Sequence, residues 1–312
     1  MGNKKQRRIS RRGFLKKSST GLVALGFVGT KPRVRSGSHP PLEKLPSPYR
    51  LLGSTGMEVS SVGFGASRTM ESALLKTALD AGVTFIDTGR SYFNGQNEFM
   101  VGETIKENRH RLIIQSKISL RLRQDEENLQ SASVSQRIKK MMEWSLAESL
   151  KALQTDYIDV MLLHGVRSMD MVRHETIMTF FQEAKKKGQI RAHGFSSHTN
   201  QVEVMQAANQ AQFYDVIMIP YNHKGSYIHS QSGRHSEWDQ TSLEKEMKKA
   251  LAHGTGIVAM KTCSAGPFAP NPESKPSYEE ALRWVLDRDT VHTMAVAMGN
   301  LEEIEEDVRA MH

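Results

Sequence analysis

Residues 157–164 read YIDVMLLH, a nearly continuous apolar run that ends in a histidine. Its apolar residues do not alternate with polar ones, so it predicts a strand that is buried on both faces, as in a parallel sheet. Seven further runs of this kind occur at residues 60–65, 83–88, 111–117, 190–197, 215–221, 256–262 and 292–299. The sequence therefore predicts eight buried strands.

Segments with helical periodicity separate these runs, and several of them end at a glycine, as helices prefer. They are residues 71–82, 97–108, 133–154, 175–188, 243–254 and 277–289. Eight strand–helix units over about 260 residues match a (β/α)8 TIM barrel, which is the fold we predict for residues 50–312, with a short N-terminal β-hairpin. An open doubly wound sheet is the alternative, but no G-x-G-x-x-G motif follows the first run.

Four ionisable side chains lie at the ends of three successive runs: Asp87 and Tyr92, then Lys117, then His164. Catalytic residues of parallel barrels sit at the carboxyl ends of the strands, so we expect these groups to converge. An ammonium beside a phenol eases proton release, Asp87 would pair with Lys117, and His164 would orient a substrate oxygen. Each residue alone also fits a structural role, but the set of four favours proton delivery to a carbonyl.

The net charge of +8 comes from the N-terminal segment. Residues 1–40 contain eleven of the 42 Lys and Arg and none of the 34 Asp and Glu. The remaining 31 Lys and Arg leave residues 41–312 with a net charge of −3. The main part of the chain therefore gives no electrostatic reason to expect nucleic acid as a partner.

Residues 1–30 resemble a twin-arginine export signal, because a basic segment with paired arginines (SRRGFLK, residues 10–16) precedes a short apolar run at 21–28. The resemblance implies the twin-arginine export machinery as a partner and a periplasmic or cell-envelope location. A basic tail is the alternative interpretation. A bilayer-spanning helix needs about 20 apolar residues, so we expect no stable membrane span beyond a tether by an uncleaved signal.

Residues 31–49 contain five prolines and predict a linker. The chain has one cysteine, Cys263, which excludes an internal disulfide and an all-cysteine iron–sulfur cluster. A cofactor is therefore expected to be organic or bound by other ligands.

In order along the chain, several motifs resemble those of the aldo-keto reductases. They are YRLLGSTGMEVSSVGFGAS (49–67), FIDTGRSY (85–92), SLAESLKALQTDYIDVMLLH (145–164), IRAHGFSS (190–197) and GIVAMK (256–261). The resemblance covers essentially all of residues 49–312. It implies a (β/α)8 barrel, NAD or NADP as cofactor, and hydride transfer between a carbonyl (aldehyde, ketone or sugar) and an alcohol. It also implies catalytic roles for Asp87, Tyr92, Lys117 and His164, with Tyr92 as proton donor.

The resemblance also indicates where the cofactor binds. Ser196 and Ser197 match positions that hold the nicotinamide amide, although the second is usually asparagine, and Tyr221 matches an aromatic that stacks on the nicotinamide ring. Where the family commonly has glutamine, this chain has Met218. Loops after the last two strands commonly hold phosphate. Further contacts are expected from Gly65, Ala66, Lys261, Ser264, Gly266, Gly299, Asn300 and Glu303.

The last helix begins LEEIEEDV and lacks the basic residues that suit a 2′-phosphate. Glu303 would accept a hydrogen bond from a ribose hydroxyl and repel a phosphate, which slightly favours NAD over NADP. Acidic residues in a first helical turn also complement the helix dipole, so a structural role stays open.

Residues 222–240 form a longer connection than is usual, and such loops are often functional. We expect this one to overhang the catalytic mouth, with Tyr227 and Trp238 shaping a polar or sugar-like substrate site. Its histidines, His223, His229 and His235, are six residues apart and match no common zinc pattern, so no metal is predicted.

Two functions are compatible with these features. The first is an exported oxidoreductase that recycles one tightly held cofactor, since no pool of free reduced cofactor is expected outside the cytoplasm. The second is a non-catalytic cofactor-binding or partner-binding barrel, which the departures at Met218 and Ser197 permit.

Overall fold

The computed structural model describes residues 48–120, 122, 129–229 and 233–312. The predicted export signal lies outside the described residues, as does the predicted linker apart from Pro48 and Tyr49. The first strand begins at Tyr49, one residue before the predicted start of the barrel. Within the described residues, no helix combines the length and apolar character needed to cross a bilayer.

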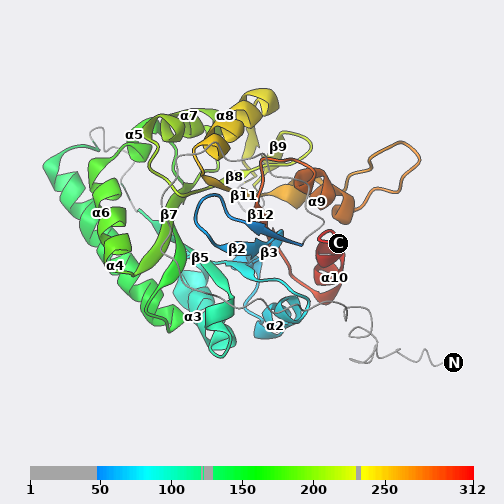
Figure 1. Cartoon of the computed structure of the whole chain (residues 1–312), viewed down its shortest axis with the longest axis horizontal. Helices are drawn as coiled ribbons and strands as arrows, with labels where there is room; N and C mark the ends of the chain where they lie inside the picture. Colours follow the sequence, from blue (N-terminus) through cyan, green and yellow to red (C-terminus); the bar gives the residue numbers. More distant parts are fainter. Residues whose placement is uncertain (1–47, 121, 123–128, 230–232) are drawn as a thin grey trace, which may run out of the picture. The chain divides into compact units, whose positions relative to one another are not determined.

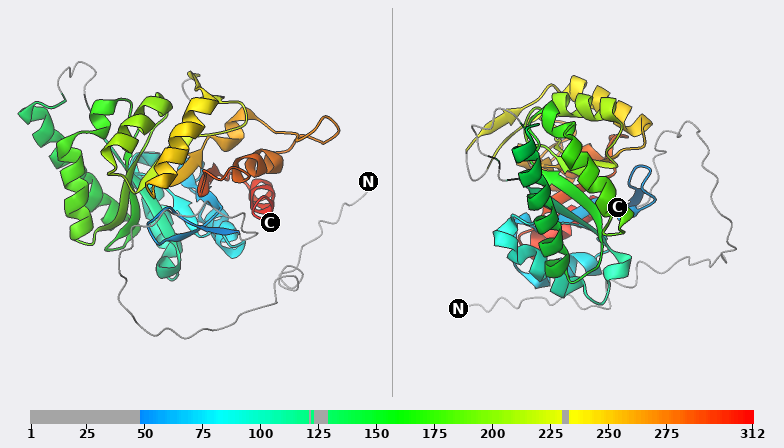
Figure 2. Two further views of the ribbon diagram at one scale, coloured as in Figure 1. Left: turned by 45° about the horizontal axis from the view of Figure 1, so that its top comes forward. Right: turned by 90° about the vertical axis from the view of Figure 1, so that its left-hand side faces the viewer.

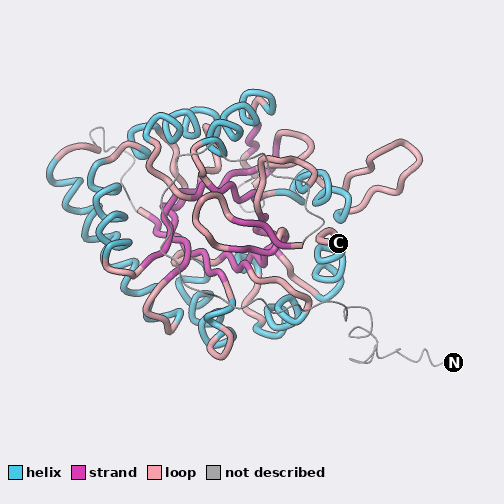
Figure 3. The backbone as a smooth tube through the Cα atoms, in the orientation of Figure 1, coloured by secondary structure: helices cyan, strands magenta, loops and turns pink. Residues whose placement is uncertain are grey.

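A closed barrel of eight parallel strands forms the centre of the structure, so the predicted fold is confirmed (Figure 1, Figure 3). Each predicted run overlaps one strand. The strands are β3 (Val62–Gly65), β4 (Phe85–Asp87), β5 (Ile113–Ser119), β6 (Ile158–His164), β7 (Ile190–Ser196), β8 (Val216–Pro220), β11 (Gly256–Met260) and β12 (Thr293–Ala297), and β12 closes the barrel by pairing with β3. Strand β5 continues two residues past its predicted run.

Helices surround the strands (Figure 1, Figure 2). They are α2 (Ser72–Asp80), α3 (Gln96–Ile105), α4 (Ala132–Leu153), α5 (Met169–Val172), α6 (Glu175–Lys186), α7 (Gln201–Ala211), α8 (Gln240–Ala252), α9 (Tyr278–Leu286) and α10 (Leu301–Arg309). Short 3-10 turns lie at η1 (Ala66–Arg68), η2 (Tyr92–Gly95), η3 (Arg109–Arg111) and η4 (Thr262–Ala265). The loop between η4 and α9 projects away from the barrel (orange in Figure 2).

Side chains along each strand alternate between the barrel interior and the surrounding helices, as the pleat requires. In β6, Leu162 packs inside the barrel whereas Leu163 joins the core shared with the helices. Phe85 of β4 also packs inside. Asp87 and His164 lie two residues beyond these interior positions, so the alternation directs both side chains into the mouth of the barrel.

An antiparallel hairpin of β1 (Tyr49–Leu51) and β2 (Glu58–Ser60) precedes the barrel. Its apolar residues Leu52, Met57 and Val59 are almost fully buried in the same cluster as the interior strand residues. The hairpin therefore fills the amino-terminal end of the barrel, and the carboxyl-terminal end is left for a site.

Candidate active site

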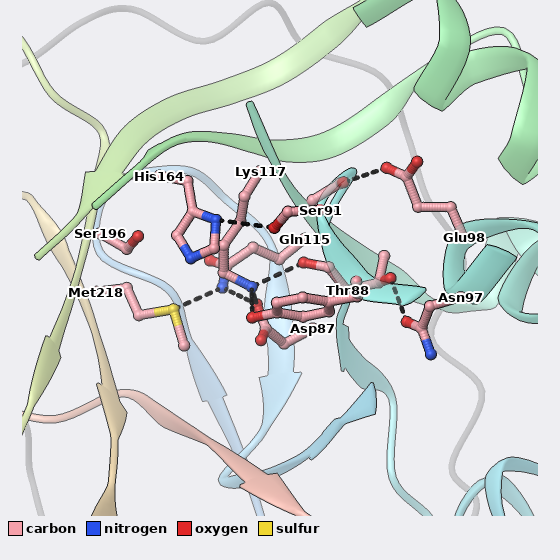
Figure 4. A network of polar contacts seen from close by, with 12 residues as sticks. Asp87, Thr88, Ser91, Asn97, Glu98, Gln115, Lys117, His164, Ser196 and Met218 are labelled. Carbon is pink, nitrogen blue, oxygen red and sulfur yellow. Dashed lines mark hydrogen bonds and ion pairs between the residues drawn. The ribbon is translucent and has the colours of Figure 1, made fainter. Parts of the chain in front are cut away.

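The ammonium of Lys117 connects two of the other predicted catalytic residues (Figure 4). Its Nζ donates to Asp87 Oδ1 at 2.6 Å and to the Thr88 carbonyl at 2.7 Å, and lies 3.0 Å from the Tyr92 hydroxyl. Gln115 Nε2 donates to the same Asp87 oxygen at 2.6 Å. Lys117 and Asp87 are both buried, so the ion pair is enclosed and hydrogen-bonded, as a buried pair must be.

His164 lies beside this pair. Its ring meets the Tyr92 ring edge-on at a centroid distance of 6.0 Å. Its Nδ1 lies 3.1 Å from Ser119 Oγ and 3.3 Å from Ser91 Oγ. The structure thus brings all four predicted groups together at the carboxyl ends of β4, β5 and β6.

Their charge states follow from burial and from one another. Burial raises the pKa of Tyr92; Lys117 opposes this rise and Asp87 adds to it. Burial alone would lower the pKa of Lys117, but Asp87 and Tyr92 reverse the direction and raise it. Burial, with Lys117 nearby, lowers the pKa of His164 to about 3. At neutral pH the site therefore holds an ammonium, a protonated phenol and a neutral imidazole.

The loop that carries Tyr92 is supported by a second buried network. Thr88 Oγ1 donates to Asn97 Oδ1 at 2.6 Å. Arg90 Nη1 lies 2.9 Å from the Glu98 carboxylate, which is fully buried. These contacts join residues before Tyr92 to residues after it, so the loop is fixed and the Tyr92 hydroxyl is held in position.

The variant Gly95→Ala tests this support. Gly95 has a φ of +86°, and a Cβ there would lie 1.1 Å from Arg90 Nη2, whereas Gly188 has a φ of +72° with no atom within 4 Å of its Cβ position. A positive φ costs an L-residue about 1–2 kcal/mol, so both alanine variants should lose that stability. Only Gly95→Ala should also displace Arg90 and shift Tyr92, lowering kcat by up to about 10²-fold. Equal kcat values for Gly95→Ala and Gly188→Ala would contradict this account.

A cleft with a volume of about 750 Å³ opens beside the four groups, within the size range of small-molecule sites. Asp87, Tyr92 and His164 line it. From there it extends along β12 and the segment after β11 to the first turns of α10. Of the predicted cofactor residues, Gly65, Lys261, Ser264 and Glu303 line the cleft, whereas Ala66, Ser196, Ser197, Tyr221, Gly266, Gly299 and Asn300 are not part of its lining.

Ser197 and Tyr221 have partners away from the cleft. Ser197 Oγ donates to the Thr199 carbonyl at 2.5 Å. The Tyr221 hydroxyl donates to Glu244 Oε1 at 2.6 Å, and its ring packs on Trp284 at 5.5 Å. In the alternation of side chains along β7 and β8, both residues point away from the barrel interior. These positions do not support the contacts with a nicotinamide that the resemblance implies. The neighbouring Ser196 faces inward, where its Oγ accepts a hydrogen bond from Gly165 N at 3.2 Å.

The start of α10 is closed by its own side chains. Asn300 Oδ1 accepts from Glu303 N at 2.9 Å, and Glu303 Oε2 accepts from Gly299 N, one residue before the N-cap, at 2.6 Å. Glu303, Glu306 and Asp307 line this end of the cleft. Burial raises the pKa of Asp307 to about 7, and the two glutamates add to the effect. A phosphate at this helix terminus would meet carboxylates.

Sequence reasoning missed two residues of the site. Gln115 holds Asp87 from inside the barrel and also contacts Met218 Sδ at 3.4 Å (Figure 4). His198 lines the cleft with its ring centroid 6.0 Å from that of His164. The signal that indicates both is the strand alternation, since Gln115 precedes Lys117 by two residues and His198 follows Ser196 by two.

The 222–240 segment contains a short antiparallel hairpin of β9 (Ser226–Ile228) and β10 (His235–Glu237). Ile228 and His229 line the cleft, as expected for a segment over the mouth. Tyr227 and Trp238 are not among the lining residues. In the part of the chain that the structure describes, no group of three or more His, Cys, Asp or Glu side chains is arranged to hold a metal ion.

The chain belongs to the aldo/keto reductase family, a family of oxidoreductases, whose pattern it matches over residues 57–280. It is 32% identical over 216 residues to the methylglyoxal reductase DkgB of Salmonella typhi, a match that covers 67% of this chain and 69% of that protein. Several other relatives are matched over about half of their own length, as with the uncharacterized oxidoreductase YqkF of Bacillus subtilis at 48%.

Solved structures of the family have the same fold. The holo form of aldo-keto reductase AKR11C1 from Bacillus halodurans superimposes with a TM-score of 0.65 at 25% identity, over 85% of this chain and 90% of that one. An aldo-keto reductase from Klebsiella pneumoniae, solved in complex with NADP and acetate, gives a TM-score of 0.60 at 22% identity, over 84% and 89%.

The cleft next to the four groups fits a nicotinamide dinucleotide. At Gly65, which lines the cleft, a Cβ would lie 2.8 Å from the Val296 carbonyl, so β3 can pack this closely on β12 only with glycine there. Two cations, Arg68 and Lys261, line the cleft and form no ion pair with any described residue. Burial, with Arg68 and Lys117 nearby, lowers the pKa of Lys261. Unpaired cations of this kind suit a pyrophosphate.

Proposed function

We propose that this chain interconverts a carbonyl compound and an alcohol by hydride transfer with NAD or NADP. The observation that carries the proposal is the position of Lys117 Nζ, which bonds to Asp87 and to the Tyr92 hydroxyl directly behind the cleft. Asp87, Tyr92 and His164 line that cleft. When bound, the nicotinamide would supply or accept the hydride. Arg68 and Lys261 would hold the pyrophosphate.

Tyr92 is the proton donor in the reductive direction. Because burial raises the pKa of its hydroxyl, the phenol keeps its proton at neutral pH. Lys117 stabilises the phenolate that forms when this proton passes to the carbonyl oxygen, and Asp87 keeps the lysine charged. The charge that develops on the substrate oxygen is thereby neutralised without a free ion in solvent.

His164 orients the substrate oxygen as a neutral donor. Its pKa of about 3 excludes a charged ring at neutral pH. The hydroxyls of Ser119 and Ser91 lie at Nδ1, where each can donate. That arrangement leaves the proton on Nε2, which can then donate to a carbonyl oxygen beside Tyr92.

The comparisons support the same class of reaction, since a relative is a methylglyoxal reductase and a structure of the same fold contains NADP. The test is oxidation of NADH and NADPH by the purified protein with a panel of aldehydes, ketones and sugars. Carbonyl-dependent loss of reduced nicotinamide absorbance is the expected result. No oxidation with any carbonyl and either cofactor would overturn the proposal.

NAD should bind more tightly than NADP. Glu303, Glu306 and Asp307 line the end of the cleft at α10, where they would repel a 2′-phosphate. Near pH 8, fluorescence titration should show that NAD(H) binds at least about tenfold more tightly than NADP(H). Since the pKa of Asp307 is about 7, its repulsion fades below that pH, and the preference should narrow near pH 6. Tighter binding of NADP(H) at both pH values would rule this out.

We also propose that residues 1–30 direct export by the twin-arginine route to the periplasm or cell envelope, and that the exported enzyme recycles one tightly bound cofactor. The paired arginines of the N-terminal segment support export. Cell fractionation should find the full chain outside the cytoplasm. It should find the variant with Arg11 and Arg12 replaced by lysine inside the cytoplasm.

Native mass spectrometry tests recycling and should find a dinucleotide retained by the protein. A cofactor-free protein that binds NAD(H) and NADP(H) with only micromolar affinity would contradict recycling.

A further inference from the structure

His198 presents a second imidazole to the cleft beside His164. The ring centroids are 6.0 Å apart, and both residues line the cleft. Nδ1 of His198 is buried without a hydrogen-bond partner among the described residues. His164 differs, because two hydroxyls lie at its Nδ1. That atom is enclosed by protein, as is Nδ1 of His223, so Nε2 is the nitrogen through which His198 can meet a ligand in the cleft.

Hydrogen bonds hold the backbone of His198, and this fixes where its ring lies. Its carbonyl accepts hydrogen bonds from the Tyr227 hydroxyl and from Ser236 Oγ, both at 3.1 Å. These two donors come from β9 and β10. The hairpin that contributes Ile228 to the mouth of the cleft therefore also fixes His198.

The surroundings of His198 are cationic. Burial lowers the pKa of this histidine to about 4, and Lys261, Lys117 and His229 act in the same direction. Asp87 is the carboxylate at this end of the cleft, and Lys117 and Gln115 already engage it. The acidic residues of α10 lie at the other end of the cleft. An anionic group beside His198 would therefore meet no unengaged carboxylate of the cleft lining at this end.

We infer that His198 determines substrate specificity by binding a carboxylate that lies a few ångströms from the reacting carbonyl, so that the preferred substrates are oxo acids. This inference rests on the proposed function and specifies its substrate class. The hydride adds to the carbonyl carbon, the Tyr92 proton passes to its oxygen, and the carboxylate stays unchanged on His198. The product is a hydroxy acid, and the reduced nicotinamide is the reductant.

The separation of the rings sets the spacing within the substrate. With 6.0 Å between centroids and about 3 Å for each hydrogen bond, the two rings can hold oxygens that belong to one short molecule. Pyruvate, 3-oxobutanoate and 4-oxopentanoate place the carboxylate at increasing distance from the ketone. Comparing their kcat/KM values identifies the spacing that fits.

The test compares each oxo acid with its methyl ester in the wild type, in His198→Leu and in His223→Leu. His223 packs on Phe268 and does not line the cleft, so it controls for loss of a histidine. One hydrogen bond to a charged group corresponds to about a 10- to 100-fold difference in binding. We therefore expect the kcat/KM of the best acid to exceed that of its ester by this factor. His198→Leu should bring the acid-to-ester ratio of kcat/KM to about one, and His223→Leu should keep the wild-type ratio.

A structural role for His198 would instead lower acid and ester rates together, which overturns the inference. If His198→Leu fails to fold, the wild-type ratio and the variant His198→Gln decide, since glutamine keeps a donor of similar size and should retain part of the preference. Turnover of esters with no advantage for any acid also overturns the inference and leaves the proposed function standing. Absence of turnover with every carbonyl overturns both.

Discussion

Tyr92→Phe is expected to lower kcat/KM for carbonyl reduction by about 10²- to 10⁴-fold, the range for loss of a general acid. The variant keeps the ring and removes only the hydroxyl, which lies 3.0 Å from Lys117 Nζ. Lys117 retains Asp87 and the Thr88 carbonyl as acceptors, so the fold should be little affected. Because burial raises the pKa of Tyr92, the wild-type rate of reduction should stay level through neutral pH and fall only as the pH approaches that raised value.

Tyr278→Phe is the matched control for this prediction. Tyr278 also lines the cleft, but 41% of it is exposed, and its hydroxyl has no partner among the described residues. The control should keep the wild-type kcat/KM when both variants are measured in the same carbonyl-reduction assay. Full activity of Tyr92→Phe would mean that another group delivers the proton.

Lys117→Met should be the most destabilising of the substitutions discussed. It leaves the Asp87 carboxylate buried without its cation, and breaking a buried ion pair in this way typically costs about 3–5 kcal/mol. Among the described residues, Gln115 is then the one side chain that donates to that oxygen. Chemical denaturation should show the loss of stability, and carbonyl reduction should fall at the same time because Tyr92 loses its charged neighbour.

The double variant with Asp87→Asn and Lys117→Met separates stability from catalysis. Neutral side chains of similar volume often replace a buried ion pair without loss of stability, so most of the lost free energy of unfolding should return. The asparagine oxygen can still accept from Gln115. Activity should not return. Recovery of activity with stability would show that the charges do not serve the chemistry.

The barrel could be predicted because each buried strand leaves a local mark, an apolar run such as 157–164 that no surface strand would have. The four catalytic groups followed, since the carboxyl ends of neighbouring parallel strands must meet. The strand order then places β4, β5 and β6 side by side. Each of these inferences depends on local pattern and simple geometry.

Other features depend on the phase of a strand or on distant contacts. Whether Tyr221 faces the cleft depends on the alternation of side chains relative to Met218, which packs inside the barrel. The Tyr221 ring packs on Trp284, which comes from a later helix. His198 is held at the site by two later residues, Tyr227 and Ser236, which both donate to its carbonyl. The β9 and β10 strands have mixed polarity and three residues each, so no apolar run announces them.

Transfer of deuterium tests the central claim most directly. The purified full-length protein is mixed with reduced nicotinamide dinucleotide deuterated at C4 of the ring, and with an oxo acid or aldehyde. Mass spectrometry then locates the label in the product. We predict one deuterium on the carbinol carbon in the wild type and almost none in Tyr92→Phe over the same time. Product without the label, or label transfer independent of Tyr92, would contradict the account.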